Sequence, residues 1–247
     1  MTPTPDLRQP ALGSARFATT QWTVVLTAAG AGSTAAHAAL SQLCQRYWYP
    51  LYAYIRRSGH STHAAEDLTQ EYFTRLLQKQ TLADVDREKG KFRSFLLASL
   101  KHFLANENDR AQTLKRGGHL QIVSLDADSA DNRYRLEPTH SLTPDKLFER
   151  RWAMAVLEQV LARLSDEQVA AGKQTLFEHF KPFLTADRSE LTYDQVAAKL
   201  AMTEGAVKVA LHRLRKRYRE LLRDEIGQTV SNPAEIDEEL RYLQSCL

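Results

Sequence analysis

The chain has 247 residues, of which 43% are hydrophobic and 26% are charged, and its 33 basic and 30 acidic residues leave a net charge of +3. This balance excludes a wholly disordered chain, because such chains combine low hydrophobicity with a large net charge. Two distant cysteines exclude a disulfide framework, and the absence of a signal peptide or a long apolar run predicts a cytoplasmic protein without membrane insertion.

The first half of the chain predicts three amphipathic helices after an N-terminal extension, residues 1–36, in which Trp22 lies on a short helix. Apolar residues recur at helical spacing from Ala39, and Pro50 predicts a kink or a restart. The second helix is expected over 63–79. After a polar loop, the third begins at Phe92 and ends before the glycine pair at 117–118.

Residues 117–143 are predicted to form an acidic linker, because Gly, Asp, Ser, Asn and Pro dominate and no apolar period is sustained. Thr143 and Pro144 mark the start of the next helix. Ser165 and Gln168 form a capping box, which predicts a separate helix to about Phe180. Convincing strand pairs are missing, so the sequence predicts an all-α fold.

The expected organisation is two helical lobes joined by the acidic linker. The lobes are residues 37–116 and 144–226, and an acidic C-terminal extension covers 227–247. In that extension Ile236, Leu240 and Leu243 predict a short acidic helix. Two roles stay open for it: packing onto the second lobe, or folding back on a basic lobe or recruiting a partner.

The second lobe contains a helix-turn-helix pattern over 192–223. Thr192 and Gln195 form a capping box, and a short break precedes a long helix with an apolar seam. Ala201 occupies the turn position where glycine is usual, at a cost of roughly 1 kcal/mol for a left-handed backbone. A helical hairpin with a solvated basic face is the alternative.

The first turns of such a second helix reach base edges, whereas later basic residues contact phosphates. The candidates on this helix are Glu204, Lys208 and His212 for bases and Arg213, Arg215, Lys216 and Arg217 for the remaining DNA contacts.

Charge is distributed in blocks that the net value hides. Residues 87–116 and 188–223 each carry a net charge of +5, whereas residues 224–247 carry −5. Solvated helix faces are one interpretation, and contact with a polyanion at two places is the other. We expect the free protein to bind duplex DNA weakly, because its acidic segments compete for the basic faces.

Four segments resemble the extracytoplasmic-function (ECF) subfamily of bacterial RNA polymerase sigma factors. In the first lobe they are AALSQLCQRYWYPLYAYIRR (38–57) with AAEDLTQEYFTRLL (64–77), and DREKGKFRSFLLASLKHFLANENDRAQTLKR (86–116). In the second lobe the segment is LTYDQVAAKLAMTEGAVKVALHRLRKRYRELLRDEI (191–226). The resemblance implies a sigma factor that binds core RNA polymerase and promoter DNA and directs transcription initiation. It leaves open whether an anti-sigma factor also binds.

The second helix has a polar face that consists of Asp67, Gln70, Glu71 and Thr74, hereafter the docking face. Periodicity alone favours a solvated face. The resemblance instead implies docking to the clamp of the largest polymerase subunit.

Around the start of the third helix, Lys89, Lys91 and Arg93 surround Phe92, a combination that suits single-stranded DNA. The resemblance implies that this region captures an unpaired promoter base, although Phe92 also fits a core position. Backbone contacts are expected from Lys101, Asn106, Lys115 and Arg116. The linker acids Asp126, Asp128 and Asp131 resemble the family's nucleic-acid-mimicking connector.

The sequence gives weaker support to two other classes of function, an enzyme and a stand-alone DNA-binding regulator. For an enzyme, His60 and His63 lack a third ligand, and neither a phosphate loop nor a catalytic pairing is present in the sequence, so we expect no catalysis and no cofactor. A stand-alone helix-turn-helix regulator would leave the first lobe without a task.

Overall fold

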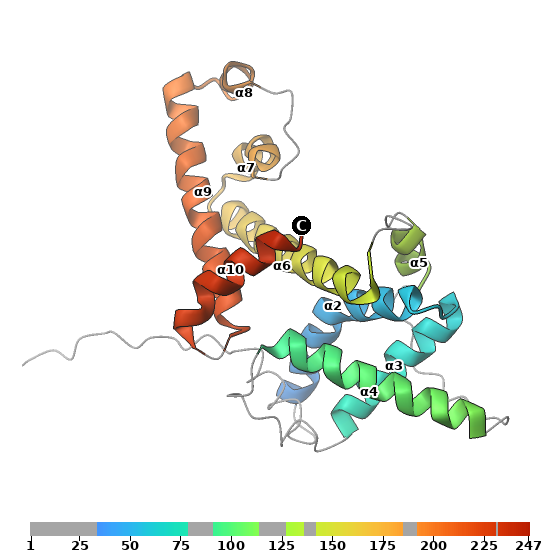
Figure 1. The fold of residues 1–247 in the computed structure, drawn as a ribbon. Helices are drawn as coiled ribbons and strands as arrows, with labels where there is room; N and C mark the ends of the chain where they lie inside the picture. Colours follow the sequence, from blue (N-terminus) through green and yellow to red (C-terminus); the bar gives the residue numbers. More distant parts are fainter. Residues whose placement is uncertain (1–33, 79–90, 114–126, 136–141, 185–191, 231) are drawn as a thin grey trace, which may run out of the picture.

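The computed structural model describes residues 34–78, 91–113, 127–135, 142–184, 192–230 and 232–247, and these contain helices and no strand (Figure 1). The predicted short helix at Trp22 and the loop at 80–90 lie outside the described residues. The helices are α2 (Thr34–Arg57), α3 (Thr62–Gln78), α4 (Phe92–Thr113), α5 (Ala127–Arg135), α6 (Pro144–Ala170), α7 (Gln174–Phe180), α8 (Tyr193–Lys199), α9 (Glu204–Gly227) and α10 (Ile236–Ser245), with single 3₁₀ turns at Lys181–Phe183 and Pro233–Glu235. The all-α prediction is therefore confirmed.

Of the kink or restart predicted at Pro50, the restart does not occur, because α2 runs through Pro50 without a break. Proline removes one backbone hydrogen bond from the helix. Tertiary packing compensates for this loss, because the side chains of residues 47–55 are all buried.

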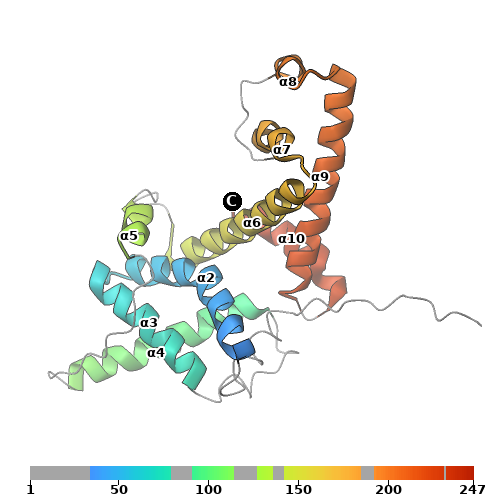
Figure 2. The same cartoon turned by 180° about the vertical axis from the view of Figure 1, so that it is seen from behind.

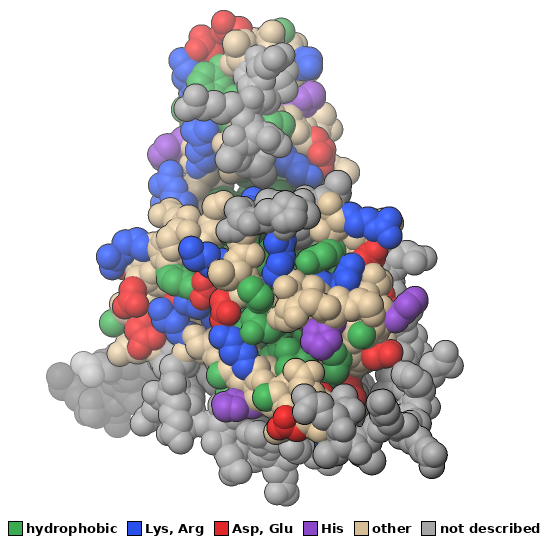
Figure 3. Space-filling model, turned by 45° about the vertical axis from the view of Figure 1, so that its right-hand side comes forward, with side chains coloured by type: hydrophobic (Ala, Val, Ile, Leu, Met, Phe, Trp, Pro, Cys, Tyr) green, Lys and Arg blue, Asp and Glu red, His purple; other side chains and the backbone are tan. Residues whose placement is uncertain are grey.

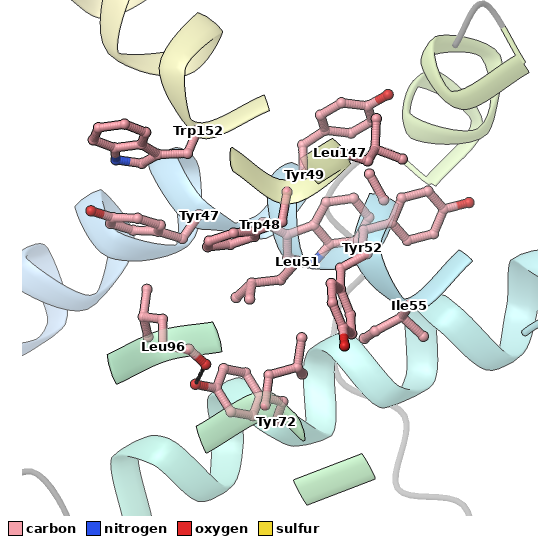
Figure 4. Close-up of a cluster of buried hydrophobic side chains, with 14 of the residues drawn as sticks. Tyr47, Trp48, Tyr49, Leu51, Tyr52, Ile55, Tyr72, Leu96, Leu147 and Trp152 are labelled. Carbon is pink, nitrogen blue, oxygen red and sulfur yellow. Dashed lines mark hydrogen bonds between the residues drawn. The ribbon is translucent and has the colours of Figure 1, made fainter. Parts of the chain in front are cut away.

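The larger hydrophobic core lies where α2, α3, α4 and the first half of α6 meet. Tyr47 and Leu51 of α2 and Trp152 of α6 are completely buried in it, and Figure 4 shows Tyr47 next to Trp152. Tyr72 of α3 donates a hydrogen bond to the Leu96 carbonyl oxygen of α4 over 3.0 Å, which satisfies a buried hydroxyl (Figure 4).

Helix α6 belongs to both ends of the molecule, as the two views of the fold show (Figures 1 and 2). Its buried residues from Leu147 to Val156 lie in the larger core, whereas Val160 and Leu164 lie in a second core with α7, α8 and α9. The boundary expected at 143–144 therefore does not separate two cores. The predicted helix start at Ser165 is wrong, because α6 runs on to Ala170.

Part of the predicted linker is the helix α5, which is attached to the first lobe. Asp131 is 8% exposed and accepts hydrogen bonds from Arg56 at 3.1 Å, Thr62 at 3.0 Å and Arg135 at 3.0 Å. Burial by itself raises the Asp131 pKa, but the hydrogen bond from Thr62 and the charge of Arg56 outweigh this effect, so the net shift of the pKa is downward. Asp131 therefore anchors α5 and does not present its charge as a nucleic-acid mimic; Asp126 lies outside the described residues.

The turn between α8 and α9 has the left-handed residue that the sequence predicted. Ala201 has a φ of 51°, and it is the only non-glycine residue with a positive φ in the described part of the chain. The amides on either side are bonded to α8, with the Met202 nitrogen donating to the Ala197 carbonyl oxygen at 3.0 Å. The turn is thus held in place at the expense of backbone strain at Ala201.

Replacing Ala201 with Gly is expected to stabilise the fold by up to about 1 kcal/mol, because glycine removes the left-handed strain but gains chain entropy on unfolding. Chemical denaturation measures this free energy. Ala198→Gly in the exposed face of α8 is the matched control and should cost about 1 kcal/mol. Equal destabilisation by both substitutions would contradict the strain at the turn.

Candidate nucleic-acid interface

The α8–α9 pair forms from strong local signals at both helix starts. The Thr192 hydroxyl caps α8 in a reciprocal capping box with Gln195, as the sequence predicted, and the Thr203 hydroxyl caps α9 by accepting from the Ala206 amide at 3.2 Å. Val207 and Leu211 bury the inner side of α9. The outer side of its first three turns is consequently directed away from the core.

The side chains predicted to contact bases lie on this outer side. Glu204, Lys208 and His212 are all exposed. Glu204 and Lys208 form an ion pair one turn apart, and their hydrogen bond raises the Lys208 pKa and lowers the Glu204 pKa. Lys208 also lies 5.8 Å from the centre of the Tyr193 ring, which orients its ammonium group across the face of the α8–α9 pair.

Of the other predicted contacts on α9, two are exposed and two are engaged within the protein. Arg213 and Lys216 are exposed. Arg215 donates to the Phe183 carbonyl oxygen at 3.2 Å, and Arg217 forms a bidentate pair with Glu167 of α6, with both distances 2.8 Å. These hydrogen bonds to Glu167, followed by that to Glu220, raise the pKa of Arg217. Arg215 and Arg217 therefore hold α9 on its neighbours in this conformation. Figure 3 shows that Lys and Arg side chains are present on the surface of the narrow upper part of the molecule.

The start of α4 differs most from the prediction. Phe92 is completely buried and packs edge-on against the Tyr47 ring with the centroids 5.4 Å apart, so the core alternative holds and Phe92 is not available to stack on a base here. Lys91 and Arg93 are paired with Glu239 of α10. Asn106 is exposed, and Lys101 is exposed but paired with Asp145. Lys89, Lys115 and Arg116 lie outside the described residues.

The docking face is presented on one side of α3. Asp67 and Glu71 are exposed, while Gln70 and Thr74 are half-buried and linked by a hydrogen bond from the Thr74 hydroxyl to the Gln70 carbonyl oxygen at 2.9 Å. Glu71 also pairs with Arg75, one turn along the helix. Arg75 in turn reaches Glu107 of α4 at 2.7 Å, which fixes this side of α3 against α4.

Other classes of site find no support in the described residues. They contain no group of three His, Cys, Asp or Glu side chains that could hold a metal ion. Within the same residues, none of the helices is long and apolar enough to cross a membrane.

Comparison with known proteins decides between a sigma factor and a stand-alone regulator. The family model for ECF sigma factors matches residues 22–224, which includes both α3 and the α8–α9 pair. The chain belongs to the ECF sigma factor family. It is also 24% identical over 201 residues to the ECF RNA polymerase sigma factor SigE of Mycolicibacterium smegmatis, covering 81% of this chain and 68% of that protein. No solved structure matches the chain significantly.

As an ECF sigma factor, the protein binds core RNA polymerase and promoter DNA and directs promoter recognition in transcription initiation. Members of this family are non-catalytic initiation factors, and anti-sigma factors are common partners. The match spans the first lobe as well as the second, so the stand-alone regulator is not favoured.

Sequence reasoning missed one residue of this ECF sigma factor that affects the candidate interface. Glu239 of α10 is completely buried and pairs with both Lys91 and Arg93. The only signal in the sequence is the acidic stretch Glu235–Glu239 beside an apolar stripe. This pattern predicted the helix but did not indicate which cations its acids contact.

Proposed function

We propose that this sigma factor divides its work among three surfaces. The docking face of α3 binds core polymerase, the outer side of α9 reads the upstream promoter element, and the start and outer side of α4 bind the melted downstream element. We further propose that it acts in the cytoplasm and has no catalytic activity of its own.

The observation that carries the upstream assignment is the exposed outer side of α9. A capped helix with a buried inner seam presents Lys208, His212, Arg213 and Lys216 without competing core contacts. Because a recognition helix enters the major groove by its N-terminal turns, we assign Lys208 and His212 to base contacts and Arg213 and Lys216 to phosphate contacts. Arg217 has a structural role as well, since its pair with Glu167 holds α9 on α6.

Lys208→Ala is expected to relax base preference at one position of the upstream element by about 1–3 kcal/mol. Arg213→Ala is expected to weaken binding to all sequences alike and to reduce the salt slope by about 1. Both are measured with reconstituted holoenzyme on duplexes selected from a randomised pool and then varied one base pair at a time. Arg163→Ala, an exposed site on α6, is the control and should change neither property. Uniform loss with Lys208→Ala would contradict the division of roles on α9.

A further inference from the structure

Helix α10 closes the junction between the two ends of the molecule. It follows α9 after a short connection and lies across α9 and α6 (Figures 1 and 2). Its Leu243 is 1% exposed and lies in the larger core together with Trp152 of α6 and Ile226 of α9. The extension is therefore a docked part of the fold.

The polar side of α10 is directed at the start of α4. Glu239 is completely buried, and its two carboxylate oxygens accept from Arg93 Nε at 2.8 Å and Arg93 Nη2 at 3.2 Å. Lys91 Nζ lies 2.7 Å from the same carboxylate. Burial by itself raises the Glu239 pKa, but the hydrogen bonds from Arg93 and Lys91 outweigh it, so the net shift is downward.

Aromatic rings complete the enclosure of the Arg93 guanidinium. Its carbon lies 4.0 Å from the centre of the Tyr242 ring of α10 and 4.8 Å from that of Trp152. Only 7% of the Arg93 side chain is exposed. In this conformation neither a phosphate nor a base can reach Arg93 from solvent.

Glu239 accepts hydrogen bonds from the same pair of Arg93 N–H groups that an arginine donates to a phosphate. Guanidinium binds carboxylate and phosphate by the same pair of parallel N–H donors. An uncompensated charge at a buried site is strongly unfavourable, so Arg93 can leave Glu239 only if another anion takes the place of that carboxylate. A nucleic-acid backbone supplies such an anion, and Lys91 would move with Arg93 to the new partner.

We propose that α10 is an autoinhibitory latch, in which Glu239 occupies the phosphate site of Lys91 and Arg93 until promoter DNA bound with core polymerase displaces it. The inference rests on the proposed role of Lys91 and Arg93 in binding the melted promoter. The charge pattern predicted that acidic segments compete with DNA for the basic faces, and the latch places this competition at the contact between Glu239 and the start of α4.

The first test compares Glu239→Gln with Asp237→Asn in the full chain. Both remove one negative charge from α10, but Asp237 is exposed and pairs with Arg223 of α9 instead of the α4 cations. The probe is a fluorescent 20-nucleotide oligothymidine, titrated at several salt concentrations. Glu239→Gln is expected to bind on the order of tenfold more tightly at low salt, with a salt slope steeper by about 1.4 for two added single-strand phosphate contacts.

Asp237→Asn is expected to bind as the unmodified protein does. An equal gain for both variants would overturn the latch, because it would be a general effect of charge.

The second test needs no substitution and remains decisive if Glu239→Gln does not fold. Hydrogen exchange of the α10 amides is compared between the free protein and the complex with core polymerase and a promoter fragment. The latch predicts faster exchange in the complex, and unchanged protection would overturn it. Faster exchange without tighter oligothymidine binding by Glu239→Gln supports release of α10 and contradicts instead the assignment of Lys91 and Arg93 to DNA.

Discussion

Replacing Asp67 with Lys is expected to abolish co-purification with core RNA polymerase while leaving the fold and the α9 surface unchanged. Asp67 is exposed at the N-terminal end of the docking face. Because the docking face carries the acids Asp67 and Glu71, we expect it to meet a basic surface of the polymerase, so the substitution places like charges together at the interface. Such contacts cost several kcal/mol, which corresponds to an affinity loss of about a hundredfold or more.

The matched control is Asp224→Lys, which makes the same change at an exposed position of α9 and should leave polymerase binding unaffected. Glu71 is left unchanged in this test, because it pairs with Arg75 and Arg75 holds Glu107 of α4. Polymerase binding that survives Asp67→Lys at full strength would place the docking surface elsewhere.

Replacing Trp152 with Ala is expected to cause the largest loss of stability, about 3–5 kcal/mol. Its side chain is completely buried between α2 and α10, and it contacts Arg93 as well as the aromatic face of α2. The loss combines removal of a large apolar surface from the core with the cavity left behind. Since α6 is shared by both cores, the substitution is expected to loosen both ends of the molecule.

Equilibrium denaturation in urea, followed by far-ultraviolet circular dichroism, measures this effect. Trp152→Phe keeps most of the buried volume and should cost clearly less than Trp152→Ala, whereas Glu158→Ala on the exposed side of α6 should be nearly neutral. A loss below about 1 kcal/mol for Trp152→Ala would contradict a core that joins α6 to the first lobe.

The features that local signals determine could be predicted from the sequence. Thr143 and Thr192 do cap α6 and α8, and both act within three residues along the chain. Ala201 takes the left-handed turn conformation because the helices on either side dictate the geometry there. The exposed outer side of α9 followed from the period of its buried seam.

The features that failed depend on contacts between residues far apart in the sequence. The capping signal at Ser165 is overridden because Val160 and Leu164 continue the buried stripe of α6 into the second core. Asp131 was predicted to belong to a nucleic-acid-mimicking linker, yet it is buried and bonded to Arg56, 75 residues away. The pair between Arg93 and Glu239 spans 146 residues, and the composition of neither segment specifies it.

The most direct test of the account is reconstituted transcription with core polymerase on a library of genomic fragments from the source organism. Purified protein is expected to add transcripts whose start sites share one upstream sequence, and Asp67→Lys is expected to remove all of them. Lys208→Ala is expected to retain activity and change the preferred base at one position of that sequence. A set of transcripts that is the same with and without the protein would contradict its assignment as a promoter-specificity subunit.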